Sequence, residues 1–152
     1  NDTTAEDVMV HRSQVAFLKR DDARTTLLNE IAESGYSRFP VYGENIDDIV
    51  GILYAKTYLT AQSRGERCEM KDFLMPPRFV HASTHINRIL LDMQREHAHM
   101  AVVVDDYGGV IGIITLEDIL EELVGEIWDE SDEVIENIRE RPDGSYTAFR
   151  HV

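Results

Sequence analysis

The sequence is poor in cysteine and in long apolar runs, and each shortage excludes a class of protein. Its 152 residues include one cysteine, Cys68, so no internal disulfide can form, and a reducing cytoplasm is the expected compartment. No run of 18 apolar residues occurs, so the sequence predicts no membrane-spanning helix. No signal peptide precedes the domain, and a start at Asn1 without Met indicates a fragment of a longer protein.

Basic residues are also scarce. There are 15 of them against 29 acidic residues, and the formal net charge is −14. Such a surface repels phosphate backbones and anionic headgroups, so we expect no nucleic-acid partner and no non-specific docking on lipid. The acid is concentrated late: between Glu117 and Glu136 there are ten Asp or Glu residues and no Lys or Arg. A run of this kind is typical of a solvated helix face followed by a charged tail.

Signatures of catalysis and of metal binding are missing as well. The sequence has neither a G-x-x-x-x-G-K-[ST] loop nor a G-x-S-x-G elbow. Cys68 lies in a polar connection without an obvious base beside it, which indicates an inert thiol. The histidines of 81–85 would diverge around a helix cap, and no cysteine completes a site with those of 97–99. We therefore expect neither an enzyme nor a metal site made by protein side chains.

The sequence does contain an order of segments that occurs twice. Each half predicts a strand, a helix, two strands joined by a turn, and a second helix. In the first half these are 15–18, 22–34 (capped by Asp22 and ended by Gly35), 39–42, 49–54 and 55–62. In the second half they are 78–81, a helix capped by Ser83 or Thr84, 100–104, 110–114 and 115–127, the last with Ile119, Leu120, Leu123, Val124 and Ile127 as its core stripe.

The two halves align at one offset of 61 residues, which places Val41 on Val102, Phe39 on Met100, Gly51 on Gly112, Ile52 on Ile113 and Leu59 on Leu120. Each unit is too small to bury a core of its own, so two of them should pack into one body. The predicted fold is α/β (α+β), with two β-α-β-β-α repeats related by pseudo-two-fold symmetry. The expected divisions are residues 5–65, residues 70–128, and an acidic linker with the start of a further domain at 129–152.

The segment Thr115-Leu116-Glu117-Asp118 follows a predicted buried strand and opens a helix. Threonine at the cap with an acid three residues later is a capping box, which has a purely structural role. A carboxylate in the first turn of a helix can also accept hydrogen bonds from both hydroxyls of a ribose. The free amides at a helix N-terminus attract phosphate. Both interpretations can hold together.

The residues around this segment resemble a known family. The run 112–118, G-I-I-T-L-E-D, resembles the G-h-h-T-x-x-D signature (h, apolar) that ends a CBS repeat, and 99–127 resembles the second CBS repeat of the CorC/HlyC family of magnesium and cobalt efflux proteins. This family includes hemolysin-labelled proteins and is related to the cyclin-M transporters. Residues 33–41 and 8–15 resemble the matching parts of its first repeat. The chain is thereby identified as a tandem CBS pair.

The resemblance implies an adenine-nucleotide site, for AMP or ATP, in the cleft between the repeats. It places Thr115 and Asp118 on the ribose, and the backbone around Val10 and Val15 beside the adenine. Arg38 can hold a phosphate through charge-assisted hydrogen bonds, or it can instead be a surface arginine paired with an acid. The remaining residues expected to line this cleft are Tyr36, Ser37 and Pro40.

The opposite cleft departs from the family pattern. The positions equivalent to Thr115 and Asp118 are Tyr54 and Thr57, which supply no carboxylate. We therefore expect one competent nucleotide site per chain. If the ligand is ATP, Mg²⁺ would be held through its phosphates, and bound Mg-ATP could change the spacing of acidic helices in a dimer.

The family also implies partners and a location. It indicates a homodimer formed through CBS pairs, an upstream membrane domain in the same chain, and a place on the cytoplasmic side of a bacterial inner membrane. Residues 141–147 resemble the first hairpin of the small domain that usually follows, and nothing in them supports flavin binding. Two other readings stay open: a ligand-free dimerisation or interaction module, and an enzyme whose catalytic part lies outside this sequence.

Overall fold

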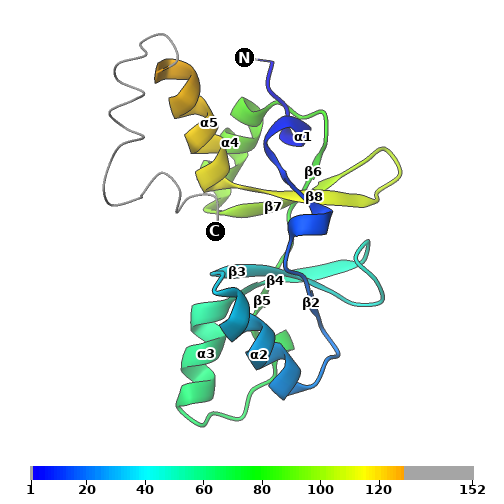
Figure 1. The fold of residues 1–152 in the computed structure, drawn as a ribbon, viewed down its shortest axis with the longest axis vertical. Helices are drawn as coiled ribbons and strands as arrows, with labels where there is room; N and C mark the ends of the chain where they lie inside the picture. Colours follow the sequence, from blue (N-terminus) through cyan, green and yellow to red (C-terminus); the bar gives the residue numbers. More distant parts are fainter. Residues whose placement is uncertain (1, 129–152) are drawn as a thin grey trace.

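The computed structural model describes residues 2–128, which form two four-stranded sheets facing each other with helices on their outer sides (Figure 1). The mixed α/β class expected from the sequence is confirmed. No helix within these residues is long and apolar enough to span a membrane. The acidic linker and the hairpin expected within 129–152 lie outside the described residues.

The chain runs through the two halves in similar order. The first half contains α1 (Ala5–Val8), β1 (Val10–His11), the 3-10 helix η1 (Arg12–Gln14), β2 (Leu18–Lys19), α2 (Arg24–Ser34), β3 (Arg38–Tyr42), β4 (Ile49–Tyr54) and α3 (Ala55–Ser63). The second half contains the 3-10 helix η2 (Met70–Phe73), β5 (Leu74–Met75), β6 (Phe79–His81), α4 (Ile86–Glu96), β7 (Met100–Val104), β8 (Val110–Thr115) and α5 (Leu116–Trp128).

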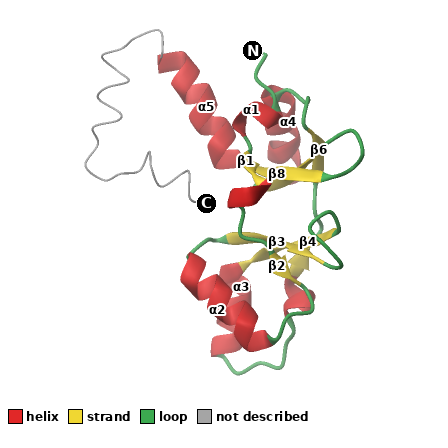
Figure 2. Ribbon diagram, turned by 45° about the vertical axis from the view of Figure 1, so that its right-hand side comes forward, coloured by secondary structure: helices red, strands yellow, loops and turns green. Residues whose placement is uncertain are grey.

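Each sheet takes one edge strand from the other half of the chain. One sheet has the order β1-β8-β7-β6 and the other β2-β3-β4-β5. Strand β1 pairs antiparallel with β8, Val10 lying opposite Ile113, while β5 pairs antiparallel with β4, Leu74 lying opposite Leu53. Figure 2 shows the chain leaving β1 beside β8 and continuing into β2 of the other sheet. The chain therefore passes from one sheet to the other twice, once between β1 and β2 and once between β5 and β6.

Three apolar clusters hold these layers together. Alternation along the strands sends neighbouring side chains to opposite faces, so Ala101 and Val103 of β7 face the helices while Met100 and Val102 face the other sheet. The cluster between the sheets consists of Ile49, Ile52, Met100, Val102, Val110 and Ile113. Because both faces of the central strands are covered, these strands read as continuous apolar runs in the sequence.

The single offset of 61 residues is wrong for part of the repeat. Strands β4 and β8 do correspond at 61, but Val41 pairs with Gly51 whereas Val103 pairs with Gly112, so β3 and β7 correspond at 62. Val41 therefore matches Val103, not Val102. The cause is the hairpin connection, which spans residues 43–48 in the first half and only 105–109 in the second.

A second difference in length lies between the edge strand and the next strand. Val10 lies opposite Ile113 and Met75 opposite Ile52, so Val10 corresponds to Met75, while Leu18 corresponds to Val80. The interval from Val10 to Leu18 is therefore three residues longer than the interval from Met75 to Val80. The 3-10 helix η1 in the first interval has this length.

Several local expectations need correction. The predicted strand at 15–18 is wrong apart from Leu18, because residues 15–17 carry the chain from one sheet to the other. Helix α2 is preceded by Ala23, since the amide of Asp22 takes part in a turn with Lys19 O at 3.2 Å. Helix α4 is capped neither by Ser83 nor by Thr84: the amide of Ile86 donates to the carbonyl of Thr3 at 3.0 Å, so the N-terminal segment closes that helix.

The expected core stripe of α5 is only partly buried. Ile119 is fully buried and Leu123 half-buried, but Leu120, Val124 and Ile127 are 42%, 40% and 65% exposed. Helix α5 packs on α4 and α1, and its exposed apolar side chains at i, i+4 and i+7 share one open face.

Candidate functional site

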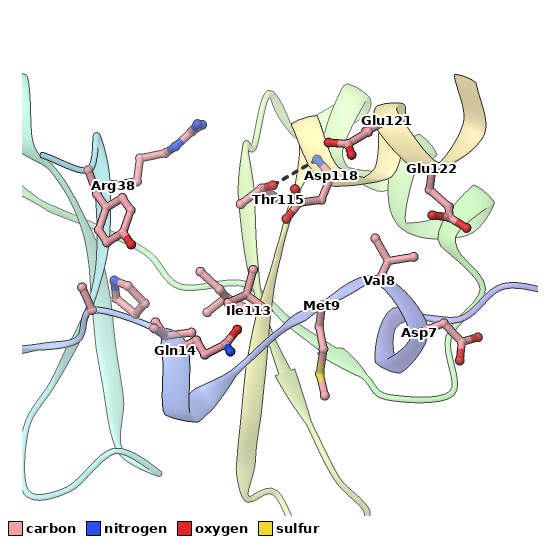
Figure 3. Close-up of a pocket in the computed structure, with 15 residues that line it drawn as sticks. Asp7, Val8, Met9, Gln14, Arg38, Ile113, Thr115, Asp118, Glu121 and Glu122 are labelled. Carbon is pink, nitrogen blue, oxygen red and sulfur yellow. Dashed lines mark hydrogen bonds between the residues drawn. The ribbon is translucent and has the colours of Figure 1, made fainter. Parts of the chain in front are cut away.

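A pocket with a volume of about 460 Å³ lies between the two halves (Figure 3). Volumes of this size are typical of sites for small ligands and cofactors. Its walls come from α1 and β1, from the crossing segment after η1, from the start of β3, from the end of β8, and from the first turns of α5. The lining residues are Asp7, Val8, Met9, Val10, Gln14, Val15, Ala16, Tyr36, Arg38, Pro40, Ile113, Thr115, Asp118, Glu121 and Glu122.

The structure brings together seven of the eight residues that the sequence assigned to a nucleotide site. These seven are Val10, Val15, Tyr36, Arg38, Pro40, Thr115 and Asp118. Ser37 is not among the lining residues: its side chain is exposed, and its carbonyl accepts a hydrogen bond from Ala55 N at 2.9 Å. Its backbone therefore joins β3 to the start of α3.

The alternation of side chains along β3 and β8 determines which residues of these strands face the pocket. Arg38 and Pro40 lie on the face of β3 opposite to buried Phe39 and Val41, which pack on the helices. In the same way Ile113 and Thr115 of β8 line the pocket. The two inner faces therefore present side chains to one space, although Arg38 and Thr115 are far apart in the sequence.

Thr115 and Asp118 form the helix cap that the sequence predicts. Thr115 is 2% exposed, and its Oγ1 accepts a hydrogen bond from the backbone N of Asp118 at 3.1 Å (Figure 3). The Thr115 hydroxyl still has a proton to donate, because it serves only as an acceptor in this contact. The capping role and a ligand-binding role are thus compatible in one residue.

Arg38 is engaged by an acid from the other half. Its Nη2 donates to Glu117 Oε2 at 2.6 Å, and the two side chains are only 10% and 19% exposed. The pairing with an acid that one reading expected is present, although Arg38 is not a surface side chain, and phosphate binding by Arg38 stays a prediction. Because Arg38 begins β3 and Glu117 lies in the first turn of α5, the pair ties the two halves together beside the pocket.

Sequence reasoning missed much of the acidic wall. Asp118, Glu121 and Glu122 are spaced at i, i+3 and i+4 on α5, which places them on one helix face, and that spacing could have revealed them. Asp7 could not have been found in this way, since α1 reaches the pocket only because β1 joins the sheet of the second half. Among the described residues, the lining then holds four carboxylates and a single cationic side chain, Arg38.

The opposite cleft has different chemistry. The corrected correspondence places Met100 and Val102 where Arg38 and Pro40 stand, and both are buried between the sheets. Tyr54, the counterpart of Thr115, packs half-buried against the same cluster, and exposed Thr57 replaces Asp118. Neither a carboxylate nor a guanidinium is present at these positions.

His81 and Cys68 take part in local contacts. His81 bonds Ser83 Oγ through Nδ1 at 2.8 Å and Asp106 Oδ1 through Nε2 at 2.6 Å. Cys68 is half-buried, with its Sγ 3.2 Å from Gln62 Nε2. Within residues 2–128 no group of three or more His, Cys, Asp or Glu is arranged to hold a metal ion.

Comparison with known proteins gives consistent matches. The CBS-domain family profile matches residues 70–125. The chain is 42% identical, over 144 residues, to the magnesium and cobalt efflux protein CorC of Pasteurella multocida, and the match covers 93% of this chain and 48% of that protein. It therefore spans about half the length of that relative.

Solved structures agree with this match. The fold is similar to that of the CBS domain of a bacterial CNNM/CorC family Mg²⁺ transporter in complex with ATP, with a TM-score of 0.74 and 35% identity over 81% of this chain and 88% of that one. It is also similar to a CBS-domain pair with bound AMP from Klebsiella pneumoniae, with a TM-score of 0.72 and 27% identity over 80% of this chain and 98% of that one.

Proposed function

The chain belongs to the CBS-domain pairs of the CNNM/CorC family, and we propose that the pocket between its halves binds an adenine nucleotide as a regulatory ligand. The observation that carries the proposal is the convergence of Thr115 and Asp118 from one half with Tyr36, Arg38 and Pro40 from the other on a single pocket. The ATP and AMP complexes of the related CBS domains support the same ligand class.

Each part of a nucleotide has a plausible partner in the lining. The adenine fits the apolar wall made by Val10, Val15 and Ile113. The ribose hydroxyls fit Asp118, whose carboxylate can accept from both, and the Thr115 hydroxyl beside it. The phosphates then extend toward Arg38, the one cationic side chain that residues 2–128 contribute to the lining.

The acid in the lining bears on the charge of the ligand. A free polyphosphate would approach Asp7, Glu121 and Glu122 against electrostatic repulsion. We therefore propose that ATP binds as its Mg²⁺ complex, with the metal held through the phosphates. Titration of ATP with and without Mg²⁺ tests this directly, and equal affinities would contradict it.

Isothermal titration calorimetry with AMP, ADP and ATP tests the site. Asp118→Asn keeps the size of the side chain and removes the charge that accepts the ribose hydroxyls, so we expect affinity to fall by about 10- to 100-fold, the effect of losing one or two charged hydrogen bonds. Thr57→Ala is the matched control, because Thr57 occupies the corresponding position in the opposite cleft. Unchanged binding in Asp118→Asn would eliminate the proposed site.

A dimer is the second proposal, and the open face of α5 favours it. Large apolar side chains are exposed on the neighbouring helices α4 and α5 of the second half, at Leu91 (56%), Leu120, Val124 and Ile127. The corresponding helices of the first half expose only Leu59, at 39%. We propose that a second copy of the chain covers the α4 and α5 face, so that the second halves meet.

Sedimentation of paired variants tests the dimer. Leu120→Asp should shift the chain toward monomer, because it places a charge in the buried interface. Leu59→Asp is the control at the corresponding position of α3 and should leave the assembly unchanged. A protein that dimerises but binds none of the nucleotides would be the ligand-free interaction module, and the nucleotide proposal would then fail.

The place of this module in a larger protein follows from its relatives. We propose that it is the cytoplasmic regulatory part of a bacterial magnesium and cobalt efflux protein, attached to an upstream membrane domain, and that it has no catalytic activity of its own. The name of the Pasteurella relative supports the transport role.

A further inference from the structure

Arg38, the residue proposed to hold the phosphate, is already paired with the carboxylate of Glu117. Arg38 lines the pocket, whereas Glu117 is not among the lining residues. The carboxylate thus reaches the guanidinium from outside the pocket, and a ligand would reach it from inside. Each half of the chain supplies one partner, so the pair is also a contact across the cleft.

The pair leaves hydrogen-bonding capacity unused. Only one contact joins the two groups, between Arg38 Nη2 and Glu117 Oε2 at 2.6 Å. Arg38 Nε and Glu117 Oε1 are both buried and have no hydrogen-bond partner within the described residues. A buried polar atom without a partner is costly, and an arginine can bind two anionic oxygens at once. A guanidinium carries five N–H donors and the hydrogen bond to Glu117 uses one of them, so donors other than the buried Nε remain for a second anion.

A second anion at Arg38 must share it with Glu117. Two negative charges on one guanidinium lie within about 6 Å of each other, and at an effective dielectric of about 20 their repulsion corresponds to roughly 100-fold in an equilibrium constant. Solvent at the pocket mouth screens part of this, which leaves about tenfold. The penalty grows with the charge of the ligand and vanishes for an uncharged one.

We propose that Glu117 is a specificity-determining residue that sets how much phosphate charge the pocket accepts. It competes with the ligand for Arg38, so the pocket favours ligands of low charge or with their charge neutralised by Mg²⁺. This inference rests on the proposed nucleotide function and concerns a residue outside the pocket lining. It predicts a graded response rather than a uniform gain or loss of binding.

The test compares wild type with Glu117→Gln, which keeps the size of the side chain and removes its charge. Calorimetry with adenosine, AMP and ATP, each without Mg²⁺, should show affinity rising by about tenfold for ATP, less for AMP, and hardly at all for adenosine. Adding Mg²⁺ should reduce the gain for ATP. An equal change for all three ligands, or no change, would overturn the proposal.

A double-mutant cycle separates competition from a purely structural effect. In an Arg38→Met background there is no guanidinium to share, so Glu117→Gln should no longer raise ATP affinity. A gain that persists in this background would also overturn the proposal. Far-UV circular dichroism checks folding, and should Glu117→Gln unfold, Glu117→Asp withdraws the carboxylate by one methylene and should give a smaller change in the same order. No change with that variant counts against the proposal as well.

The proposed nucleotide function and the proposed role of Glu117 are contradicted by different results. A wild-type chain that binds no nucleotide, with or without Mg²⁺, removes the proposed function itself. A wild-type chain that binds nucleotide while Glu117→Gln binds ATP no more tightly leaves the function in place and removes only the role of Glu117.

Discussion

Replacing Gly112 by alanine tests the crossing of β1 that builds one wall of the pocket. Gly112 lies in β8 opposite His11 of β1. A β-carbon on Gly112 would lie well inside contact distance of the Val10 carbonyl oxygen and 2.8 Å from Met9 Sδ. The carbonyl belongs to the backbone and cannot rotate away, so β1 has to move off β8.

The size of the effect follows from how little holds β1. The strand is two residues long and pairs with β8 only at Val10 and His11. Overpacking of this kind costs about 1–3 kcal/mol, and loss of a ladder hydrogen bond about 1 kcal/mol more. We expect the free energy of unfolding to fall by about 2–4 kcal/mol, which lowers Tm by roughly 5–12 °C in a chain of this size. Nucleotide affinity should fall too, since Val10 lines the pocket.

Urea unfolding followed by circular dichroism measures this, with two glycine controls. Gly51 is the counterpart of Gly112, and its β-carbon would lie 2.8 Å from Leu74 Cβ and 3.0 Å from Met75 O. Gly51→Ala should therefore lose similar stability without weakening nucleotide binding. For Gly125 in α5, no described atom outside its chain neighbours and its own helix backbone lies within 4 Å of that position, and Gly125→Ala should gain about 0.5–1 kcal/mol. A loss below about 0.5 kcal/mol in Gly112→Ala would refute the reasoning, given the overpacking costs expected here.

Three further predictions follow from the fold. Residues 5–65 and 70–128 expressed separately should stay unfolded by circular dichroism and fold when mixed, because each sheet needs an edge strand from the other piece. Burial raises the pKa of the Tyr58 hydroxyl above its usual value of 10, so the unfolded chain loses this proton at a lower pH than the folded chain. The free energy of unfolding should therefore fall as pH rises above about 10, by at most about 1.4 kcal/mol per pH unit. In urea unfolding, Tyr58→Phe should abolish this contribution to the pH dependence. Arg12→Ala removes the hydrogen bond to Val110 O at 2.7 Å and should lower the free energy of unfolding by about 1 kcal/mol in the same assay.

The elements that sequence reasoning placed well are those specified by local signals. Strands β4 and β7 match their expected bounds because each is a continuous apolar run next to the polar turn of its hairpin. Strands β1 and β5 were missed, since two-residue strands have no periodicity to read and exist only through pairing with distant partners. The cap of α4 failed for a related reason: the carbonyl that closes α4 comes from Thr3, about eighty residues away in the sequence.

The residues of the candidate site also divide into those that local signals reveal and those that depend on distant pairing. Thr115 and Asp118 could be found because a capping signature and a family motif coincide there. Arg38 was found, but its contact with Glu117 could not be, because the distance between them depends on how the two sheets face each other. Asp7 and Met9 reach the pocket only through the exchanged strand, which no local pattern indicates.

The exchange of edge strands also has a consequence for how such a chain can arise. A single repeat with its first strand in its neighbour's sheet is complete only as two copies, so the geometry is that of a two-fold dimer joined into one polypeptide after gene duplication. In a dimer of identical copies, every insertion occurs twice. After fusion the two crossings are encoded separately, so one can contain the three extra residues of η1 while Pro76 and Pro77 restrict the backbone of the other. Fusion thus lets the two crossings differ in length and stiffness while both keep their edge strands paired.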